Sequence, residues 1–190
     1  MAGVALAGIM LLMMWVAPLA ATEESHRGSA PADALLSLIP RDGELDGWVR
    51  DGTSVLCYDE ESLSEYIDGA APYYLERGAV AVLFQYYLRP ASGEEAKIEI
   101  YRMRDRPSAR LLFEEIEKGK PASPGTEIGG LGEDYHLEQA LLGIDLLEFH
   151  EGPFFVRIEV RGRGQRTQRE AIEFGLRICR SIRELPPGAE

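Results

Sequence analysis

The stretch Phe154-Phe-Val-Arg-Ile-Glu-Val-Arg161 decides the fold, because its side chains alternate with a period of two. Successive side chains of a strand point to opposite faces, so this stretch has one apolar face and one mixed face. The apolar face holds Phe154, Val156, Ile158 and Val160, and the other face holds Phe155, Arg157, Glu159 and Arg161. The preceding run Ile144–His150 is joined to it by Glu151-Gly-Pro153, which is typical of a turn. The two runs therefore predict an antiparallel hairpin.

Further strands are predicted on the N-terminal side of this hairpin. Ala79–Leu88 is almost wholly apolar or aromatic, as in a strand covered on both faces. Pro90–Gly93 turns it into the alternating run Ala96–Tyr101, which predicts a second hairpin. A short strand is also predicted at Val55–Tyr58, and the late group of strands begins at Asp134.

Helices are predicted between these strands and at the end of the chain. Asp59 can cap one helix, and Pro107 begins another that ends at Gly119. The last helix has a predicted capping box at Thr167-x-x-Glu170. This order of elements predicts the α+β class: a single antiparallel sheet of about five strands, helices packed on it, and a C-terminal helix that closes the domain.

The N-terminus predicts export. Residues 1–21 carry no charge, and an apolar run from Val4 to Val16 is followed by Pro18 and the small residues Ala20 and Ala21. This order is typical of a cleavable signal peptide, and the run is short for a membrane helix of about 20 residues. A retained membrane anchor is the alternative, because no Lys or Arg precedes the run. The expected organisation is a signal peptide at 1–21, a flexible leader with a short helix at 22–40, one α+β domain at 41–185 and a tail at 186–190.

Charge argues against two classes of partner. The formal net charge is −12 and all charges lie after the predicted signal segment. An acidic protein repels phosphate backbones, so we expect no binding to nucleic acid. We also expect no membrane span after signal cleavage, and a location in the periplasm or the medium.

The two cysteines leave two alternatives open. An even number in an exported chain permits one disulfide, which would join Cys57 to Cys179. Two separate buried thiols that act as small apolar side chains are equally compatible with the sequence.

One segment resembles a known family. The stretch Glu65-Tyr-Ile-Asp-Gly-Ala-Ala-Pro-Tyr-Tyr-Leu-Glu-Arg-Gly78 is similar to the Tyr-Ile-x-Gly-x-Ala…Tyr…Tyr-Gly segment of a family of bacterial exported proteins of unknown function. The resemblance extends in outline over residues 45–183, with Ala79 in place of the expected Phe. It implies export and a fold but no chemistry. By element order the chain also resembles domains of the photosystem II oxygen-evolving PsbP type.

The same segment supplies a candidate ligand site. Tyr66, Asp68, Gly69, Tyr73 and Tyr74 could line a pocket with Asp68 as its acid. The alternative is that the tyrosines pack at a tight corner between helices and Asp68 caps a chain end.

Two weaker patterns point to ions. Asp134, His136 and Glu138 share one face of a predicted strand and could hold a divalent metal, or could be an exposed edge. The basic loop with Arg161, Arg163 and Arg166 leads into a helix N-terminus and could bind an anion, or could be a solvated turn. Glu148 and His150 share a strand face and are interpreted as exposed polarity.

Because no catalytic, metal or nucleotide motif is present, the sequence favours a non-enzymatic module of the cell envelope that binds a small ligand or an envelope protein, with no cofactor. The alternative is a hydrolase that uses acidic residues near Asp68 or at Asp134–Glu138.

Overall fold

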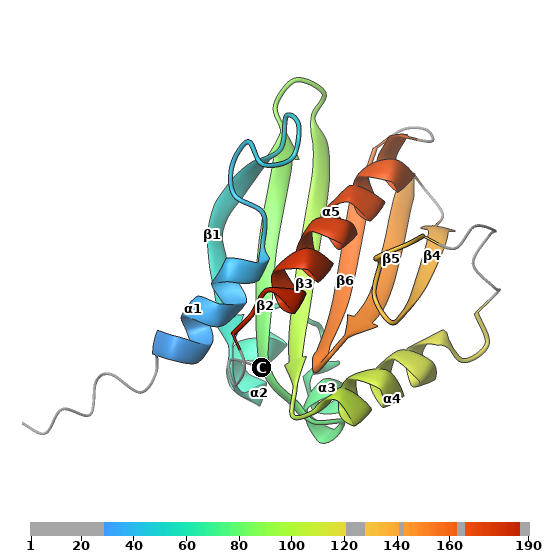
Figure 1. Cartoon of the computed structure of the whole chain (residues 1–190). Helices are drawn as coiled ribbons and strands as arrows, with labels where there is room; N and C mark the ends of the chain where they lie inside the picture. The colour runs from blue at the N-terminus through green and yellow to red at the C-terminus, as the bar shows by residue number, and fades with distance from the viewer. Residues whose placement is uncertain (1–28, 121–127, 141–142, 163–165, 187–190) are drawn as a thin grey trace, which may run out of the picture.

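A computed structural model describes residues 29–120, 128–140, 143–162 and 166–186. The predicted signal peptide and the residues 22–28 and 187–190 of the predicted leader and tail lie outside these ranges. The described residues form a six-stranded antiparallel sheet with the strand order β1-β2-β3-β6-β5-β4, and helices pack on it (Figure 1). The α+β class is confirmed, with six strands where about five were expected.

The elements follow one another as a single strand, one hairpin and a three-stranded meander, separated by helices. The strands are β1 (Val49–Cys57), β2 (Ala79–Arg89), β3 (Glu94–Met103), β4 (Asp134–Ala140), β5 (Ile144–Glu151) and β6 (Phe154–Arg161). The helices are α1 (Ser29–Leu38), α2 (Glu60–Ser64), α3 (Ala71–Glu76), α4 (Arg106–Glu117) and α5 (Arg166–Arg183). Strand β1 is longer than the predicted Val55–Tyr58, because its register against β2 shifts between Asp51 and Val55 and the strand continues past the shift.

One face of the sheet, here called the α5 face, is covered by α5 and α1 (Figure 1). Phe174 of α5 is fully buried and its ring meets Trp48 and Tyr87 edge to face at 5.3 and 5.1 Å. Gly175 allows α5 to approach closely, because a Cβ at this position would lie 2.7 Å from side-chain atoms of Leu131 and Leu147. The α5 face therefore holds the larger apolar core.

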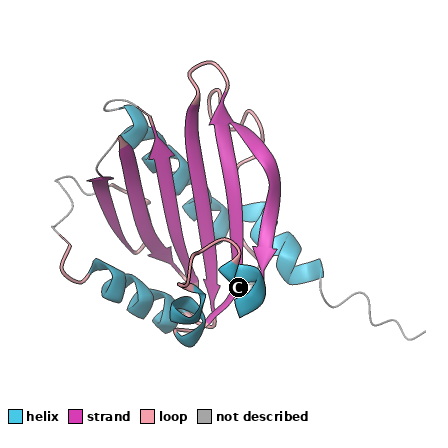
Figure 2. Ribbon diagram, turned by 180° about the vertical axis from the view of Figure 1, so that it is seen from behind, coloured by secondary structure: helices cyan, strands magenta, loops and turns pink. Residues whose placement is uncertain are grey.

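The opposite face, here called the α4 face, is covered only at one end. Helices α2, α3 and α4 gather at the end of the sheet where β2 begins and β3 finishes (Figures 1 and 2). They bury a second apolar cluster that includes Leu63, Tyr74, Leu112, Tyr101 and Phe155. The remainder of the α4 face has no helix over it among the described residues (Figure 2).

Local signals explain where the helices start. The Asp59 carboxylate accepts a hydrogen bond from the Ser62 amide at 2.9 Å, and Asp105 does the same for Ser108 at 2.8 Å, so both act as N-caps. The predicted capping box at Thr167 is wrong. Helix α5 begins at Arg166, so Thr167 lies inside the first turn, and its hydroxyl donates to Asp145 on β5.

The predicted leader also needs correction within residues 29–40. Leu35, Leu38 and Ile39 are fully buried in the core of the α5 face, and α1 contacts α5. Residues 35, 38 and 39 of the predicted leader therefore belong to the apolar core. No helix in the part of the chain that the structure describes is both long and apolar enough to cross a membrane.

The two cysteines are free and buried. Cys57 belongs to the cluster of the α4 face and Cys179 to the core of the α5 face, so the sheet lies between them. Of the two alternatives, the structure has two separate thiols and no Cys57–Cys179 bridge. Burial raises the pKa of the Cys179 thiol to about 11, which disfavours the reactive thiolate.

Candidate functional site

The α4 face carries a row of charged side chains on adjacent strands, which runs from its uncovered part to the edge of α4. Strand pairing places Glu99 beside Arg157, Arg157 beside Glu148, and Glu148 beside His136. These four residues, on β3, β6, β5 and β4, are called the charged row here. Paired residues of neighbouring antiparallel strands lie about 5 Å apart, so the row crosses four strands without a gap.

The Glu99 end of the row is anchored by a lysine and two tyrosines. The Glu99 side chain is 4% exposed, and its two oxygens accept hydrogen bonds from Lys97 Nζ at 2.7 Å and from the Tyr101 hydroxyl at 2.6 Å. The Tyr101 ring stacks on Tyr74 with 4.3 Å between ring centroids. Burial, reinforced by the Glu99 carboxylate, raises the pKa of Tyr101 far above its ordinary value, so this hydroxyl stays a donor.

The Glu148 end is held by the residues that follow α4. The Glu148 carboxylate is 2% exposed and accepts a hydrogen bond from Lys120 Nζ. Lys120 also bonds Glu117 at 3.0 Å, and His136 Nδ1 lies 2.5 Å from the other Glu117 oxygen. Burial raises the pKa of Glu117, because it disfavours the charged carboxylate more than Lys120 and His136 favour it.

Arg157 lies at the centre of the row with acids on several sides. Its Nη2 is 3.1 Å from Glu159, and its Nε is 3.7 Å from Glu148, which is too long for a hydrogen bond. Nε is a buried donor without a hydrogen-bond partner in the structure. Burial opposes the charge, but Glu99, Glu148 and Glu159 together raise the pKa of Arg157 above its ordinary value.

The charges of this face are layered by depth. The carboxylates of Glu99 and Glu148 lie at the floor, with 4% and 2% of their side chains exposed. The cations that neutralise them lie nearer solvent, with 21% exposed for Lys97, 22% for Lys120 and 31% for Arg157. The two buried carboxylates thus fix the positions of the lysine and arginine side chains above them. These cations still have N–H groups at the surface that are free to bind a ligand.

A cavity of about 480 Å³ opens next to the row. Its polar and aromatic lining includes Asp51, Tyr86, Glu95, Lys97, Glu159 and Arg161. Pairing places Asp51, Tyr86, Lys97 and Glu159 side by side on β1, β2, β3 and β6. The Tyr86 side chain is among the exposed large apolar groups, at 44%, although most of β2 is buried. A volume of this size suits a small organic molecule.

The tyrosine pocket predicted around Asp68 does not form as one site. Tyr66 stacks on Phe84 at 5.2 Å, Tyr74 is buried against Tyr101, and the Tyr73 ring lies under the Arg77 guanidinium. Asp68 is exposed next to Gly69, whose positive φ makes the turn between α2 and α3, and Ala70 rather than Asp68 is the N-cap of α3. Tyr66 and Tyr74 nevertheless border the charged row, through Phe84 and Tyr101.

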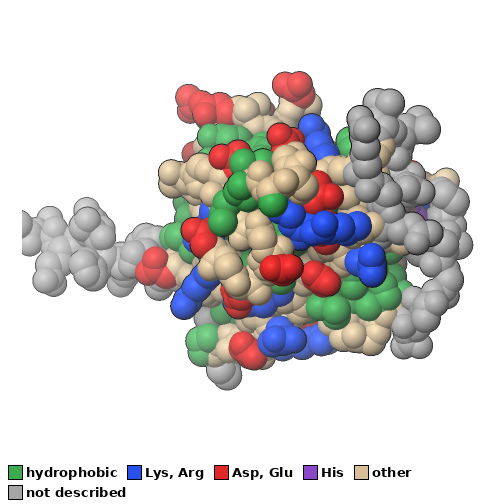
Figure 3. Space-filling view, turned by 90° about the horizontal axis from the view of Figure 1, so that it is seen from above, with side chains coloured by type: hydrophobic (Ala, Val, Ile, Leu, Met, Phe, Trp, Pro, Cys, Tyr) green, Lys and Arg blue, Asp and Glu red, His purple; other side chains and the backbone are tan. Residues whose placement is uncertain are grey.

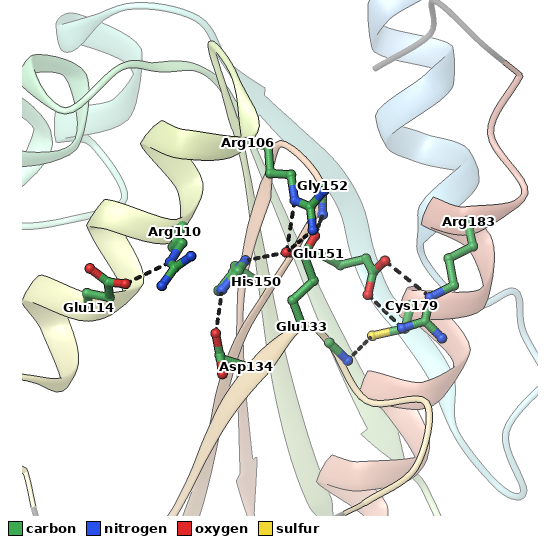
Figure 4. Close-up of polar contacts among 11 residues, drawn as sticks. Arg106, Arg110, Glu114, Glu133, Asp134, His150, Glu151, Gly152, Cys179 and Arg183 are labelled. Atoms are coloured by element: carbon green, nitrogen blue, oxygen red, sulfur yellow. Dashed lines mark hydrogen bonds and ion pairs between the residues drawn. The ribbon is translucent and has the colours of Figure 1, made fainter.

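The predicted metal residues Asp134, His136 and Glu138 are engaged with other side chains, and Figure 4 shows this for Asp134. Asp134 lies 3.3 Å from His150 Nε2, and Glu133 lies 3.9 Å from the other ring nitrogen of His150. His136 bonds Glu117, with Glu138 at 3.9 Å. Within the described ranges, no group of three or more His, Cys, Asp or Glu side chains could hold a metal ion.

The interpretation of Glu148 and His150 as exposed polarity is wrong. Both residues are buried, at 2% and 1% exposure, because α4 lies against β5 and Lys120 bonds Glu148. His150 is enclosed by the Phe113 ring of α4, 5.4 Å away, and by the acids on either side of it. Near it, Arg106 bonds Glu133 at 2.7 Å and Arg183 bonds Glu151 at 2.6 Å, so this cluster is largely neutralised (Figure 4).

The predicted anion site is divided in the structure. Arg161 lines the cavity beside Tyr86, whereas Arg166 donates to Glu170 at 2.8 Å and lines a smaller cavity of about 250 Å³ at the start of α5. Arg163 lies outside the described residues. Glu170 also pairs with the buried Arg89, so acids accompany the arginines at this end of α5.

Comparison of this chain with family models, curated proteins and solved structures finds no match. The resemblance to the exported bacterial family therefore stays a prediction. The proposed function is therefore based on the charged row and the cavity beside it.

The sequence contained a trace of the charged row that sequence reasoning missed. Glu99 and Arg157 alternate with apolar residues in their strands, which predicts that they share a face but not that this face is partly buried. Lys120 carried no sequence signal, because its role depends on where the chain runs after α4. Counting long charged side chains at matching positions of β3, β6 and β5 would have indicated the row.

Proposed function

We propose that this protein is a non-enzymatic binding module that holds a small polar molecule on the uncovered part of its α4 face. The observation that carries the proposal is the charged row, in which Glu99 and Glu148 are buried on the partly open α4 face. Glu148 lies at the edge of the area that α4 covers. The cavity beside the row supplies the space for the ligand.

Stability alone does not account for such a row. Removing a carboxylate from water costs several kcal/mol, and apolar side chains of similar volume usually replace a buried ion pair without loss of stability. The neighbouring row under α3 and α4 is apolar in this manner, with Val82, Tyr101 and Phe155 on paired strands. Charges fixed beside an open cavity are instead suited to orient a polar ligand, because their positions need no rearrangement on binding.

Native mass spectrometry tests the proposal. The purified mature protein is incubated with a mixture of amino acids, short peptides, sugars and organic acids, and bound masses are recorded. We expect at least one adduct in the wild type and its loss in Arg157→Met. The matched control is Arg110→Met, since Arg110 lies on the outer side of α4 in an exposed pair with Glu114. The absence of adducts in the wild type, or their retention in Arg157→Met, would contradict the proposal.

The proposal includes export to the periplasm or the medium, following the predicted signal peptide at residues 1–21. An envelope protein as partner is the other form that the binding could take. Intact mass of the protein recovered from an exporting bacterial host tests the first point. A mass that begins at Thr22 is expected, and a mass that retains residues 1–21 would favour the membrane-anchored alternative.

A further inference from the structure

We propose that the cavity beside the charged row takes a zwitterionic ligand of dipeptide size, with an ammonium group near Asp51 and a carboxylate near Lys97 and Arg161. This inference rests on the proposed function and specifies the chemical class of its ligand.

The cavity has an acid and a base on opposite sides of an aromatic ring. Asp51, Tyr86 and Lys97 are paired in this order across β1, β2 and β3, and they share the α4 face. Adjacent strands lie about 4.8 Å apart, so the backbones that carry Asp51 and Lys97 are about 10 Å from each other. Lys97 Nζ lies 6.0 Å from the Tyr86 centroid and 5.4 Å from the Phe84 centroid. The distance between the opposite charges therefore suits a ligand of two residues better than a single amino acid.

The Asp51 side offers an unused anion. The Asp51 side chain is exposed and, within the described part of the chain, its carboxylate has no hydrogen bond or ion pair. An ammonium group placed here would meet this carboxylate and the electron-rich face of Tyr86, which is 44% exposed. Lys97 also lies over the Tyr86 ring, but its Nζ is nearer the Phe84 centroid, at 5.4 Å, and is bonded to Glu99 at 2.7 Å, which leaves the Asp51 side of the ring to the ligand.

The other side offers unused donors. Lys97 has three N–H groups, and Glu99 is the one carboxylate within ion-pair distance of it among the described residues. The Arg161 guanidinium is 58% exposed and lies 3.8 Å from Glu159, beyond hydrogen-bond distance. A ligand carboxylate that reaches both cations would accept charge-assisted hydrogen bonds from them, beside Glu159 and Glu95, which strand pairing places next to Lys97 and Arg161.

The net charge of the protein disfavours ligands that carry several negative charges. The protein carries a formal net charge of −12. Acidic and basic side chains are interspersed over the end of the molecule that carries the β2–β3 turn, without a broad basic area (Figure 3). A polyanion would therefore be repelled, whereas a ligand with no net charge approaches freely and still meets both ends of the cavity.

Four probes and isothermal titration calorimetry test the inference on the mature protein. Glycylglycine is the zwitterion, glycylglycine amide lacks the carboxylate, N-acetylglycylglycine lacks the ammonium, and maltose is a neutral polyol. We expect glycylglycine to bind at least about tenfold more tightly than each of the other three, which corresponds to about 1.4 kcal/mol. Equal affinity for either blocked peptide, or for maltose, would overturn the inference.

Two variants assign the ends of the ligand. Asp51→Asn should abolish the preference for glycylglycine over its N-acetyl form, and Arg161→Met should reduce the preference over the amide. Both side chains are exposed, so both variants should fold, and an unchanged melting temperature checks this. Unchanged preferences in both variants would place the ligand elsewhere. If no peptide binds, but other molecules give adducts that Arg157→Met loses, the zwitterionic ligand class is wrong and the proposed binding function stands. If such adducts are missing as well, both the ligand class and the binding function are wrong.

Discussion

The two faces of the sheet are built from the same alternating strands but use their side chains in opposite ways. On the α5 face, Phe174 inserts between Trp48 and Tyr87, and the helix lies so close that Gly175 has no room for a side chain. On the α4 face, short helices cover one end, and the strands continue beyond them with charged residues. The difference separates the part of the molecule that stabilises the fold from the part that we propose binds a ligand.

The largest expected effect is on the free energy of unfolding, and it is seen when one aromatic residue from each face is replaced by alanine. Phe174→Ala should lower the free energy of unfolding by about 3–5 kcal/mol, because it leaves a cavity in a fully buried cluster. Tyr86→Ala is the counterpart on the α4 face and should cost less than about 1 kcal/mol, because surface substitutions have small effects. Urea unfolding followed by circular dichroism measures both. Similar losses in the two variants would show that the faces do not differ in this way.

A smaller effect is expected when the charged row is disturbed. Glu148→Leu leaves Lys120 and Arg157 without their buried anion, and should cost about 2–3 kcal/mol, below the range for fully buried pairs because both cations reach solvent. The triple variant Glu99→Leu, Arg157→Leu and Glu148→Leu removes the core of the row together. It should unfold within about 1 kcal/mol of the wild type and lose ligand binding. A loss equal to the sum of the single variants would mean that the row is structural.

The smallest effect is a difference in how two glutamates respond to pH. A hydrogen bond from Arg177 of α5 lowers the pKa of Glu44 below its ordinary value of 4.5, whereas burial raises that of Glu117 on the α4 face above the same value. A lowered pKa contributes stability that is present above the unfolded pKa and is lost as pH falls through the folded one. When folding raises the pKa of an acid, stability is instead lost as pH rises from the pKa of the unfolded state to the pKa of the folded state.

Two substitutions should therefore change the stability profile in opposite directions. Relative to the wild type, Glu44→Gln should be most destabilising at pH 7 and approach zero effect as pH falls below about 4. Glu117→Gln should become more favourable relative to the wild type as pH rises from 4.5 through the raised pKa of Glu117. This trend adds to a loss of the Glu117 contacts with Lys120 and His136. Urea titrations at several pH values measure both trends. Parallel profiles for the two variants would contradict the assignment.

Sequence reasoning predicted much of the fold because the decisive signals are local. The alternation in Phe154–Arg161 predicted the β6 strand, Asp59 predicted the start of α2, and Pro107 lies in the first turn of α4. The class, the two hairpins and the closing α5 helix follow from such patterns. The α1 helix was predicted, but its burial was not, since Leu35 and Leu38 find their partners far along the chain.

The candidate site depends on contacts that no local pattern contains. The sequence by itself determined that Glu99, Arg157 and Glu148 lie on the mixed face of their strands, because side chains alternate in any strand. Only the tertiary structure decided that β3, β6 and β5 are neighbours in a register that aligns these charges, and that α4 leaves part of this face open while Lys120 reaches Glu148. The physical reason is that burial and ion pairing depend on which elements meet in space, and period-two alternation carries no information about that.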